Sequence, residues 1–199
     1  MTTPIPFLEG NQVHVRGLSV EDAAGPMGQW TNDREVSRTL YRGAFPSDAG
    51  TVAKEIEASR ASAADIEFAV IETESGRHVG VAGIHGLNWV ARHCEFRILM
   101  GERDVWGQGY GTEATQLMVV YAFEVLNMAK VWLGVVKDNA GAVRCYEKAG
   151  FVREGELRNE VYRNSRYYDV IRMSILRDEY DQVKAEWTIA DKIREQFPQ

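Results

Sequence analysis

The clearest hydrophobic pattern in the chain lies in the segment that follows Gly111. Apolar residues recur there at i, i+3, i+4, i+7, i+8 and i+11, and they are Ala114, Leu117, Met118, Tyr121, Ala122 and Val125. This spacing is that of one face of an α-helix. Val119, Val120 and Phe123 widen the apolar face, so the pattern predicts a helix that is largely buried.

Upstream of this helix, short apolar runs bounded by turn residues are typical of strands. The three runs are Phe68 to Glu72, Val79 to His85 and Cys94 to Met100. A turn at Glu74-Ser75-Gly76 separates the first two, and a looser loop separates the second from the third. We therefore expect an antiparallel meander, preceded by a further strand at Val13 to Arg16.

The segment between Arg16 and Phe68 predicts short helices. Ser19 and the acidic residues after it resemble a capping box, and Gly25-Pro26 should break the helix that begins there. A second helical piece is expected after Asn32-Asp33, and a third from about Asp48 to Ala61.

Downstream of the buried helix, the pattern predicts a strand, a helix and two more strands. Val131 to Val136 is a short apolar run, and a helix connects it to the strand that ends at Met100, so these two strands should be parallel. Asn139 can cap a helix over Ala140 to Ala149, which Gly150 ends. The final strands are expected at Phe151 to Asn159 and Tyr167 to Ile175, around a turn at Asn164-Ser165.

The tail from Arg177 to Phe197 is amphipathic. Its apolar side is formed by Tyr180, Val183, Trp187, Ala190 and Ile193. This side can pack on its own domain or on a second subunit, which would make the protein a homodimer. The order of elements predicts an α+β (mixed α/β) fold, with one domain over residues 1–180 and a C-terminal helical extension over residues 181–199.

Composition limits the class of protein. The chain has 199 residues, of which 45% are apolar and 26% are charged, as in ordinary globular domains. The net charge of −6 and the lack of a dense basic stripe argue against nucleic acid as the main partner. No apolar run is long enough to span a membrane, and two cysteines fit a reduced, cytoplasmic setting. The four histidines show no metal-ligand spacing with the cysteines, so no metal is expected.

The strongest chemical signal is the turn Trp106-Gly107-Gln108-Gly109-Tyr110-Gly111, which runs directly into the buried helix. Its glycines let a ligand approach the backbone, and the helix N-terminus favours a phosphate there. A nucleoside triphosphate loop would need a lysine before Thr112, and there is none. Gly109, Gly111 and Ala114 have dinucleotide spacing, but the loop from Met100 is too long for a tight first βα turn.

The same turn resembles the Gln/Arg-x-x-Gly-x-Gly/Ala segment of the GNAT superfamily of N-acetyltransferases, with Trp106 at its first position. Asn139-Ala140-Gly141-Ala142-Val143-Arg144-Cys145-Tyr146-Glu147-Lys148-Ala149-Gly150-Phe151 resembles a second motif of that superfamily. The resemblance is to the branch of ribosomal-protein N-terminal acetyltransferases and spermidine acetyltransferases. It implies a mostly antiparallel central sheet with one parallel, splayed strand pair, flanked by helices.

The resemblance also implies a binding site for acetyl-CoA. The pyrophosphate would lie at Gly107, Gln108, Gly109, Tyr110, Gly111 and Thr112. The backbone of Ile98, Leu99 and Met100 would hydrogen-bond the pantetheine arm, which Asn139 would also contact. Gly101 can permit the strand distortion that this requires. The tyrosine hydroxyl of Tyr146 would protonate the departing thiolate.

Two catalytic residues are candidates. Tyr146 lies seven residues beyond Asn139, so the two share a helix face, although a core tyrosine is the alternative. Glu95 is the candidate base, acting through water, although a structural salt bridge with Arg97 is the alternative. His85 and His93 are further candidates because imidazole titrates near neutral pH. Trp30 and Tyr41 are candidates for lining the acceptor pocket.

The sequence thus predicts an acetyl-CoA-dependent N-acetyltransferase that acetylates a primary amine by direct transfer in a ternary complex. The acceptor would be a small-molecule amine or a peptide N-terminus. Two alternatives remain: a non-catalytic acyl-CoA-binding or regulatory module, and a nicotinamide-dependent oxidoreductase.

Overall fold

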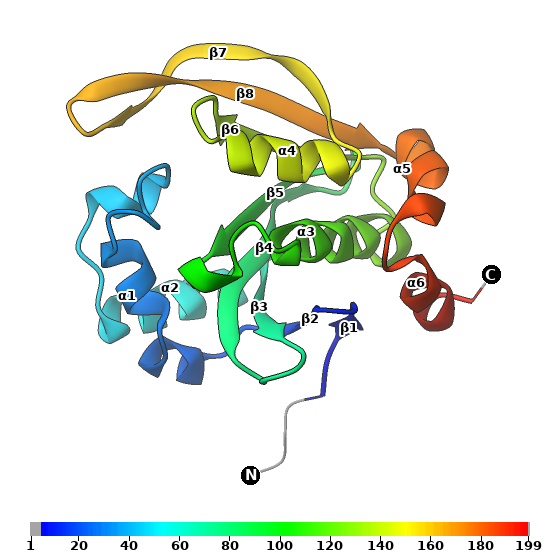
Figure 1. Cartoon of the computed structure of the whole chain (residues 1–199), viewed down its shortest axis with the longest axis horizontal. Coiled ribbons are helices and arrows are strands. Elements are labelled where there is room, and N and C mark those ends of the chain that lie inside the picture. Colours follow the sequence, from blue (N-terminus) through cyan, green and yellow to red (C-terminus); the bar gives the residue numbers. More distant parts are fainter. Residues whose placement is uncertain (1–4, 199) are drawn as a thin grey trace.

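The computed structural model describes residues 5–198, apart from the side chains of Tyr41 and Arg42. Within this range the strands form one eight-stranded sheet in the order β1-β2-β3-β4-β5-β6-β8-β7 (Figure 1). The strands are β1 (Leu8–Glu9), β2 (Val13–Gly17), β3 (Ile66–Glu72), β4 (His78–Asn88), β5 (His93–Met100), β6 (Lys130–Val136), β7 (Val152–Arg163) and β8 (Arg166–Leu176). Neighbouring strands are antiparallel except β5 and β6, which are parallel. The mixed fold with one parallel pair is confirmed.

Helices cover both faces of this sheet. On one face lie α3 (Tyr110–Val120) and α4 (Ala140–Lys148), and on the other lie α1 (Met27–Asn32) and α2 (Ala49–Ala61). Side chains alternate between the two faces of a strand, so β3 serves both layers. Its Phe68 and Val70 join the main core with α3, whereas Ala69 and Ile71 pack in a second cluster with α2.

The apolar stripe of α3 is buried as the spacing predicts, with one exception. Ala114, Leu117, Met118, Tyr121 and Ala122 lie in the core, but Val125 is 45% exposed. The reason is that the helix changes to a π-helical turn over Tyr121–Val125, which shifts the residues after it out of the 3.6-residue period.

The prediction of a second helix directly after Asn32-Asp33 is wrong. α1 instead ends at Asn32, and Asp33 is its C-cap in an extended conformation. The Asp33 carboxylate accepts the backbone N–H groups of Glu35 (2.8 Å) and Val36 (3.3 Å). Such a local side-chain turn competes with a helix. The third piece is confirmed as α2, which Asp48 caps by accepting the Thr51 N–H at 2.7 Å.

The tail forms two short helices, α5 (Arg177–Val183) and α6 (Ala190–Gln196). Tyr180, Trp187 and Ile193 belong to the same core cluster as α3, so the apolar side of the tail packs on its own chain. The Gln196 amide also bonds the backbone of Glu9, donating to its carbonyl and accepting its N–H, both at 2.9 Å. The division of the chain at residue 180 stays a prediction. None of the described helices has the length and apolarity needed to cross a membrane.

Candidate active site

The turn before α3 presents a row of backbone N–H groups without protein partners. Gly107 and Gly109 have φ of +75° and +97°, a conformation that glycine adopts without steric cost. Gly109 is the N-cap of α3, and no side chain caps this end. Within residues 5–198, the N–H groups of residues 107–112 donate no hydrogen bond to any other residue. Free N–H groups at a helix N-terminus suit a phosphate, so the turn fits the pyrophosphate that the sequence predicts.

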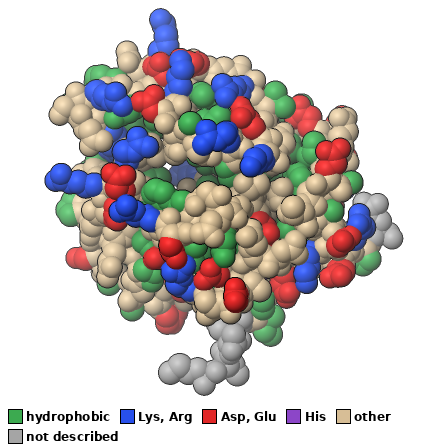
Figure 2. Space-filling view, in the orientation of Figure 1, with side chains coloured by type: hydrophobic (Ala, Val, Ile, Leu, Met, Phe, Trp, Pro, Cys, Tyr) green, Lys and Arg blue, Asp and Glu red, His purple; other side chains and the backbone are tan. Residues whose placement is uncertain are grey.

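The side chains of this turn serve mainly to hold it in place. The Gln108 amide donates to the carbonyl of Asp104. The Tyr110 hydroxyl donates to Glu72 Oε1 at 2.9 Å, and the Thr112 hydroxyl donates to Cys145 Sγ at 3.5 Å. What the turn offers to a ligand is therefore its backbone. Figure 2 shows a hollow between α4 and the loop that leads to α3, with Lys and Arg side chains on its rim, a charge that favours an anion.

β5 and β6 pair over only three residues and then separate. The pairs are His93 with Lys130, Cys94 with Val131, and Glu95 with Trp132. Beyond Glu95, β5 continues alongside β4 to Met100, and β6 continues alongside β8 to Val136. One edge of β5 is therefore open from residue 96 onward, which is where an extended ligand can add to a sheet.

Only alternate residues of β5 direct their backbone into this gap. Gly101 donates its N–H to the Val79 carbonyl of β4 at 2.9 Å, and backbone groups alternate between the two edges of a strand. Leu99 is therefore directed to β4, whereas Ile98 and Met100 face the gap. The Met100 carbonyl already accepts the Trp106 indole N–H at 3.0 Å. Of the three residues predicted to hold the pantetheine arm, the groups left for a ligand are those of Ile98 and the N–H of Met100.

Tyr146 lies on α4 where β5 and β6 separate. It is 8% exposed, and its ring packs edge-to-face on Phe96 at a centroid distance of 6.2 Å. Burial and the neighbouring Cys145 raise the pKa of the Tyr146 hydroxyl above its ordinary value, so the hydroxyl keeps its proton at neutral pH. It makes no hydrogen bond within the described residues. Tyr146 is thus a core residue with a protonated and uncommitted hydroxyl.

Asn139 has two partners within the chain. Its Oδ1 accepts the Ala142 N–H at 3.3 Å and caps α4, as the sequence predicts. Its Nδ2 donates to the Thr39 hydroxyl at 3.3 Å, which joins α4 to the loop that follows α1. Contact of Asn139 with the cofactor arm stays a prediction.

Glu95 forms the salt bridge with Arg97 that the sequence offered as the alternative to a catalytic role. Its Oε2 accepts from Arg97 Nη2 at 2.7 Å. Across β4 and β5, Glu95 pairs with His85, so their side chains lie next to each other on one face of the sheet. Burial, and then the charge of Arg97, lower the pKa of His85, which favours the neutral ring. His85 Nδ1 also lies 3.3 Å from Asp65 Oδ1.

Trp30 lies against the end of β5. It is 3% exposed and its indole N–H donates to Glu102 at 2.8 Å. A Cβ at Gly101 would come within 1.9 Å of the Trp30 ring, so glycine is needed there to make room for the indole. Trp30 lines a hollow of about 330 Å³ with the residues that follow Gly101. The Tyr41 side chain lies outside the described residues.

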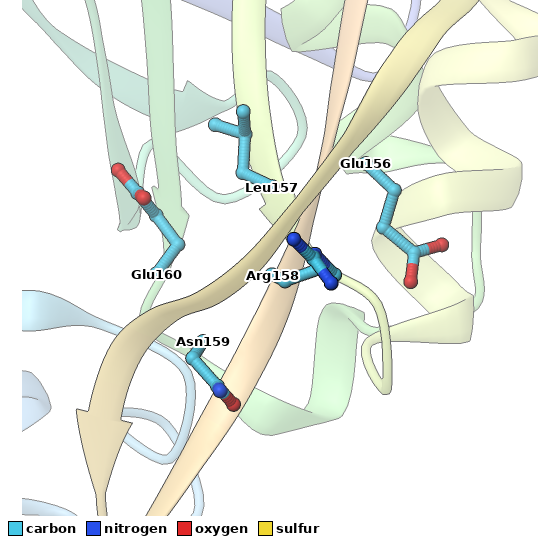
Figure 3. Close-up of a pocket in the computed structure, with 5 residues that line it drawn as sticks. All are labelled: Glu156, Leu157, Arg158, Asn159 and Glu160. Atoms are coloured by element: carbon cyan, nitrogen blue, oxygen red, sulfur yellow. The ribbon is translucent and has the colours of Figure 1, made fainter.

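A larger hollow of about 560 Å³ lies along β7 and is lined by Glu156, Leu157, Arg158, Asn159 and Glu160. Figure 3 shows Leu157 and Glu160 on one side of the β7 ribbon and Glu156 on the other. Glu156 accepts from Lys137 at 2.7 Å, whereas Glu160 has no ion pair within residues 5–198. Among the described residues, no group of three or more His, Cys, Asp or Glu side chains is placed to hold a metal ion.

Two supporting residues have no counterpart in the sequence interpretation. Phe96 provides the ring on which Tyr146 packs. Glu113 is a buried carboxylate in the first turn of α3. A glutamate next to the apolar stripe of this helix is a visible signal, but its partners lie about a hundred residues away and cannot be identified from spacing.

Comparison of the sequence with known protein families matches the chain to a domain family. The sequence profile described as Acetyltransferase (GNAT) domain matches residues 12–152. Spermidine N(1)-acetyltransferase of Vibrio cholerae is 35% identical over 111 residues, which are 56% of this chain and 64% of that protein. The Escherichia coli K12 protein of the same name is 38% identical over 111 residues, 56% of this chain and 59% of that protein. The matched part is thus less than two thirds of either relative.

Solved structures agree with the profile. The crystal structure of spermidine N-acetyltransferase from Vibrio cholerae in complex with CoA and spermine superimposes with a TM-score of 0.77 at 27% identity. The superposition covers 85% of this chain and 98% of that one. A putative ribosomal N-acetyltransferase of Bacillus subtilis, YdaF, is 28% identical over 106 residues, 53% of this chain and 57% of that protein.

Proposed function

Because the chain belongs to the acetyltransferase (GNAT) domain family, we propose that it is an N-acetyltransferase that moves an acetyl group from acetyl-CoA directly to a primary amine. One observation carries the proposal: the open edge of β5 begins beside Tyr146 and ends at Met100, whose side chain lies 3.5 Å from where a Cβ at Gly111 would stand, close to the row of free N–H groups before α3. An extended ligand with an anionic end matches this arrangement.

The backbone would do most of the binding. The N–H groups of residues 107–112 would hold the pyrophosphate, and the backbone of Ile98 and Met100 would hold the pantetheine arm. Acetyl-CoA supplies an activated acetyl thioester. Holding the thioester and the amine in line can contribute about 7–11 kcal/mol.

Tyr146 would act as the acid. Its hydroxyl is protonated, has no competing partner, and lies where the two strands separate. It would donate its proton to the departing sulfur and regain one from solvent.

The amine must first lose a proton. An alkylamine with a pKa of about 10.4 is charged at pH 7, and neutralising it costs roughly 4–5 kcal/mol. Glu95 would take this proton through water. His85 beside it is the alternative acceptor, because its lowered pKa leaves the ring unprotonated at neutral pH and so free to take a proton.

The acceptor is a polyamine-like molecule or a peptide N-terminus. The relatives named spermidine N(1)-acetyltransferase and the putative ribosomal N-acetyltransferase support these two options respectively. We favour the polyamine-like acceptor, because Glu160 leaves an unpaired carboxylate on the hollow along β7 that can attract a second ammonium group. Homodimer formation and a cytoplasmic location stay predictions from the sequence.

The two alternative functions, an oxidoreductase and a non-catalytic binding module, lead to different expectations. A nicotinamide-dependent oxidoreductase would need the glycines in a tight turn directly after a strand of a doubly wound sheet. Here the 3₁₀-helix Arg103–Val105 separates β5 from the glycine turn, and the sheet is mostly antiparallel. A non-catalytic module would bind acetyl-CoA without consuming it in the presence of any amine.

The test is a screen for acetyl-CoA consumption with polyamines, amino sugars, aminoglycosides and short peptides, accompanied by calorimetric titration with CoA. Binding of CoA together with faster thiol release for at least one amine class supports the proposal. Binding without acceleration by any amine favours the non-catalytic module. Thermal stabilisation by NAD but not by CoA would refute CoA binding itself.

A further inference from the structure

Glu113 is a buried carboxylate tied to a distant part of the chain. It lies in the first turn of α3 and is 4% exposed. Its Oε1 accepts the backbone N–H groups of Gln12 at 2.6 Å, in the turn between β1 and β2, and of Val13 at 2.9 Å, the first residue of β2. Burying a charge is costly unless hydrogen bonds satisfy it, so these two bonds fix the position of the first turn of α3 relative to that hairpin.

The hairpin turn is shaped to accept this carboxylate. Gly10 faces it so closely that an added Cβ would lie 2.2 Å from Glu113 Oε1. The same hairpin turn also contacts residues 107–112 directly, a segment called the glycine loop from here on. Gln12 Nε2 donates to the carbonyl of Gln108 in this loop at 3.2 Å. Gln12 Oε1 also lies 3.0 Å from where a Cβ at Gly109 would stand. The Gly10–Gln12 turn therefore contacts both the start of the helix and the loop before it.

These contacts hold the glycine loop through the Gln108 carbonyl and through Glu113 in the first turn of α3, and they leave the N–H groups of the loop free. Glycine has many alternative conformations, so Gly107 and Gly109 by themselves do not hold the six N–H groups in one arrangement. Orienting a loop in advance of ligand binding reduces the ordering cost that the ligand must otherwise meet.

We propose that Glu113 and Gln12 are positioning residues that hold the glycine loop in the geometry that binds the pyrophosphate of acetyl-CoA. The proposal rests on the proposed function, since it assumes that the loop binds CoA. It assigns neither residue a contact with the reacting atoms. If the untied loop keeps its binding geometry about one tenth of the time, the apparent Kd for CoA rises about tenfold.

The first experiment compares Glu113→Ala with Glu113→Gln by calorimetric titration with CoA and by steady-state kinetics. Glu113→Ala should raise Kd for CoA and KM for acetyl-CoA about tenfold, with kcat at saturating acetyl-CoA within about twofold of the original protein. Glu113→Gln keeps an acceptor oxygen for both N–H groups and should restore Kd to within about twofold. Leu117→Ala is the control for lost stability, because Leu117 is buried one turn further along α3 and has no bond to the hairpin turn.

The second experiment uses two exposed amides in one turn. Gln12→Ala removes the bond to Gln108, whereas Asn11→Ala removes a bond from Asn11 Nδ2 to the carbonyl of Thr188, away from the loop. Gln12→Ala should raise Kd for CoA about threefold, and Asn11→Ala should leave it unchanged. Comparing these two variants still tests the positioning role if Glu113→Ala does not fold.

Unchanged CoA affinity in both Glu113→Ala and Gln12→Ala would overturn the positioning role and leave the proposed function intact. So would an equal loss of affinity in the Leu117→Ala and Asn11→Ala controls, because the effect would then follow stability. Failure of the unaltered protein to bind CoA would overturn both the positioning role and the proposed function.

Discussion

Replacing Tyr146 by phenylalanine tests the proposed acid with little disturbance of the fold. The ring keeps its contacts with Phe96 and with Phe151, whose ring centroid lies 6.0 Å away. The hydroxyl has no hydrogen-bond partner within residues 5–198, so its removal should change the free energy of unfolding by less than about 1 kcal/mol. Acid catalysis typically contributes about 10²–10⁴-fold, so kcat should fall by that factor, equivalent to about 3–5 kcal/mol.

The assay is release of the CoA thiol at saturating amine, with the Kd for CoA measured separately. Tyr121→Phe is the matched control, because Tyr121 is also buried, packs its ring on Phe7 and Phe68, and lies away from the strand gap. It should leave kcat unchanged. Burial holds the pKa of Tyr146 above its ordinary value of about 10, so kcat of the original protein should not decline from ionisation of Tyr146 below about pH 10. A Tyr146→Phe variant that binds CoA and keeps more than half of the original kcat would refute the assignment.

Three further predictions follow from other parts of the molecule. Gly109→Ala should weaken CoA binding and lower stability by about 1–2 kcal/mol, because Gly109 has φ of +97°; Gly155→Ala, where a Cβ meets nothing within 4 Å, is the control for CoA titration and thermal melting. Glu160→Gln should raise KM several-fold for a diamine but not for a monoamine of the same length, and equal effects on both would exclude recognition of a second charge. Burial alone would raise the pKa of Asp22, but hydrogen bonds from Arg16 and Ser19 outweigh it and lower that pKa, so Asp22→Asn should cost about 1–3 kcal/mol at pH 7. This cost should persist down to about pH 5 and disappear as the pH falls through the lowered pKa, and urea unfolding that gave the same difference at pH 3 would contradict it.

The sequence predicted best those elements whose signals are local. The 3.6-residue stripe of α3, the Asn139 cap of α4 and the turn residues of the meander each depend on neighbours a few positions away, and the structure has them all. The errors also have local causes. The Asp33 carboxylate turns the chain where helix was expected, and the π-helical turn at Tyr121–Val125 moves Val125 to the surface.

The candidate site depends on contacts that no local pattern specifies. The chemical identity of Tyr146 and of the glycine turn is visible in the sequence, and the gap between β5 and β6 was expected only by resemblance. Its start after Glu95 depends on where β6 stops pairing with β5, while on its other edge β6 goes on pairing with β8 to Val136, and these strands lie far apart in the chain. The alternation that directs Ile98 and Met100 into the gap, and Leu99 to β4, follows from the register of β5 on β4, which the bond from Gly101 to Val79 shows.

The same reasoning explains why a loop rich in glycine can still form a defined binding site. Its freedom is a local property of Gly107 and Gly109, but the restraint comes from Glu72 through Tyr110 and from the hairpin turn through Glu113 and Gln12. The glycines must stay without Cβ atoms so that their N–H groups remain accessible, and therefore other residues must supply the rigidity. A site of this kind should lose cofactor affinity when its distant ties are cut, even though no residue that touches the cofactor has changed.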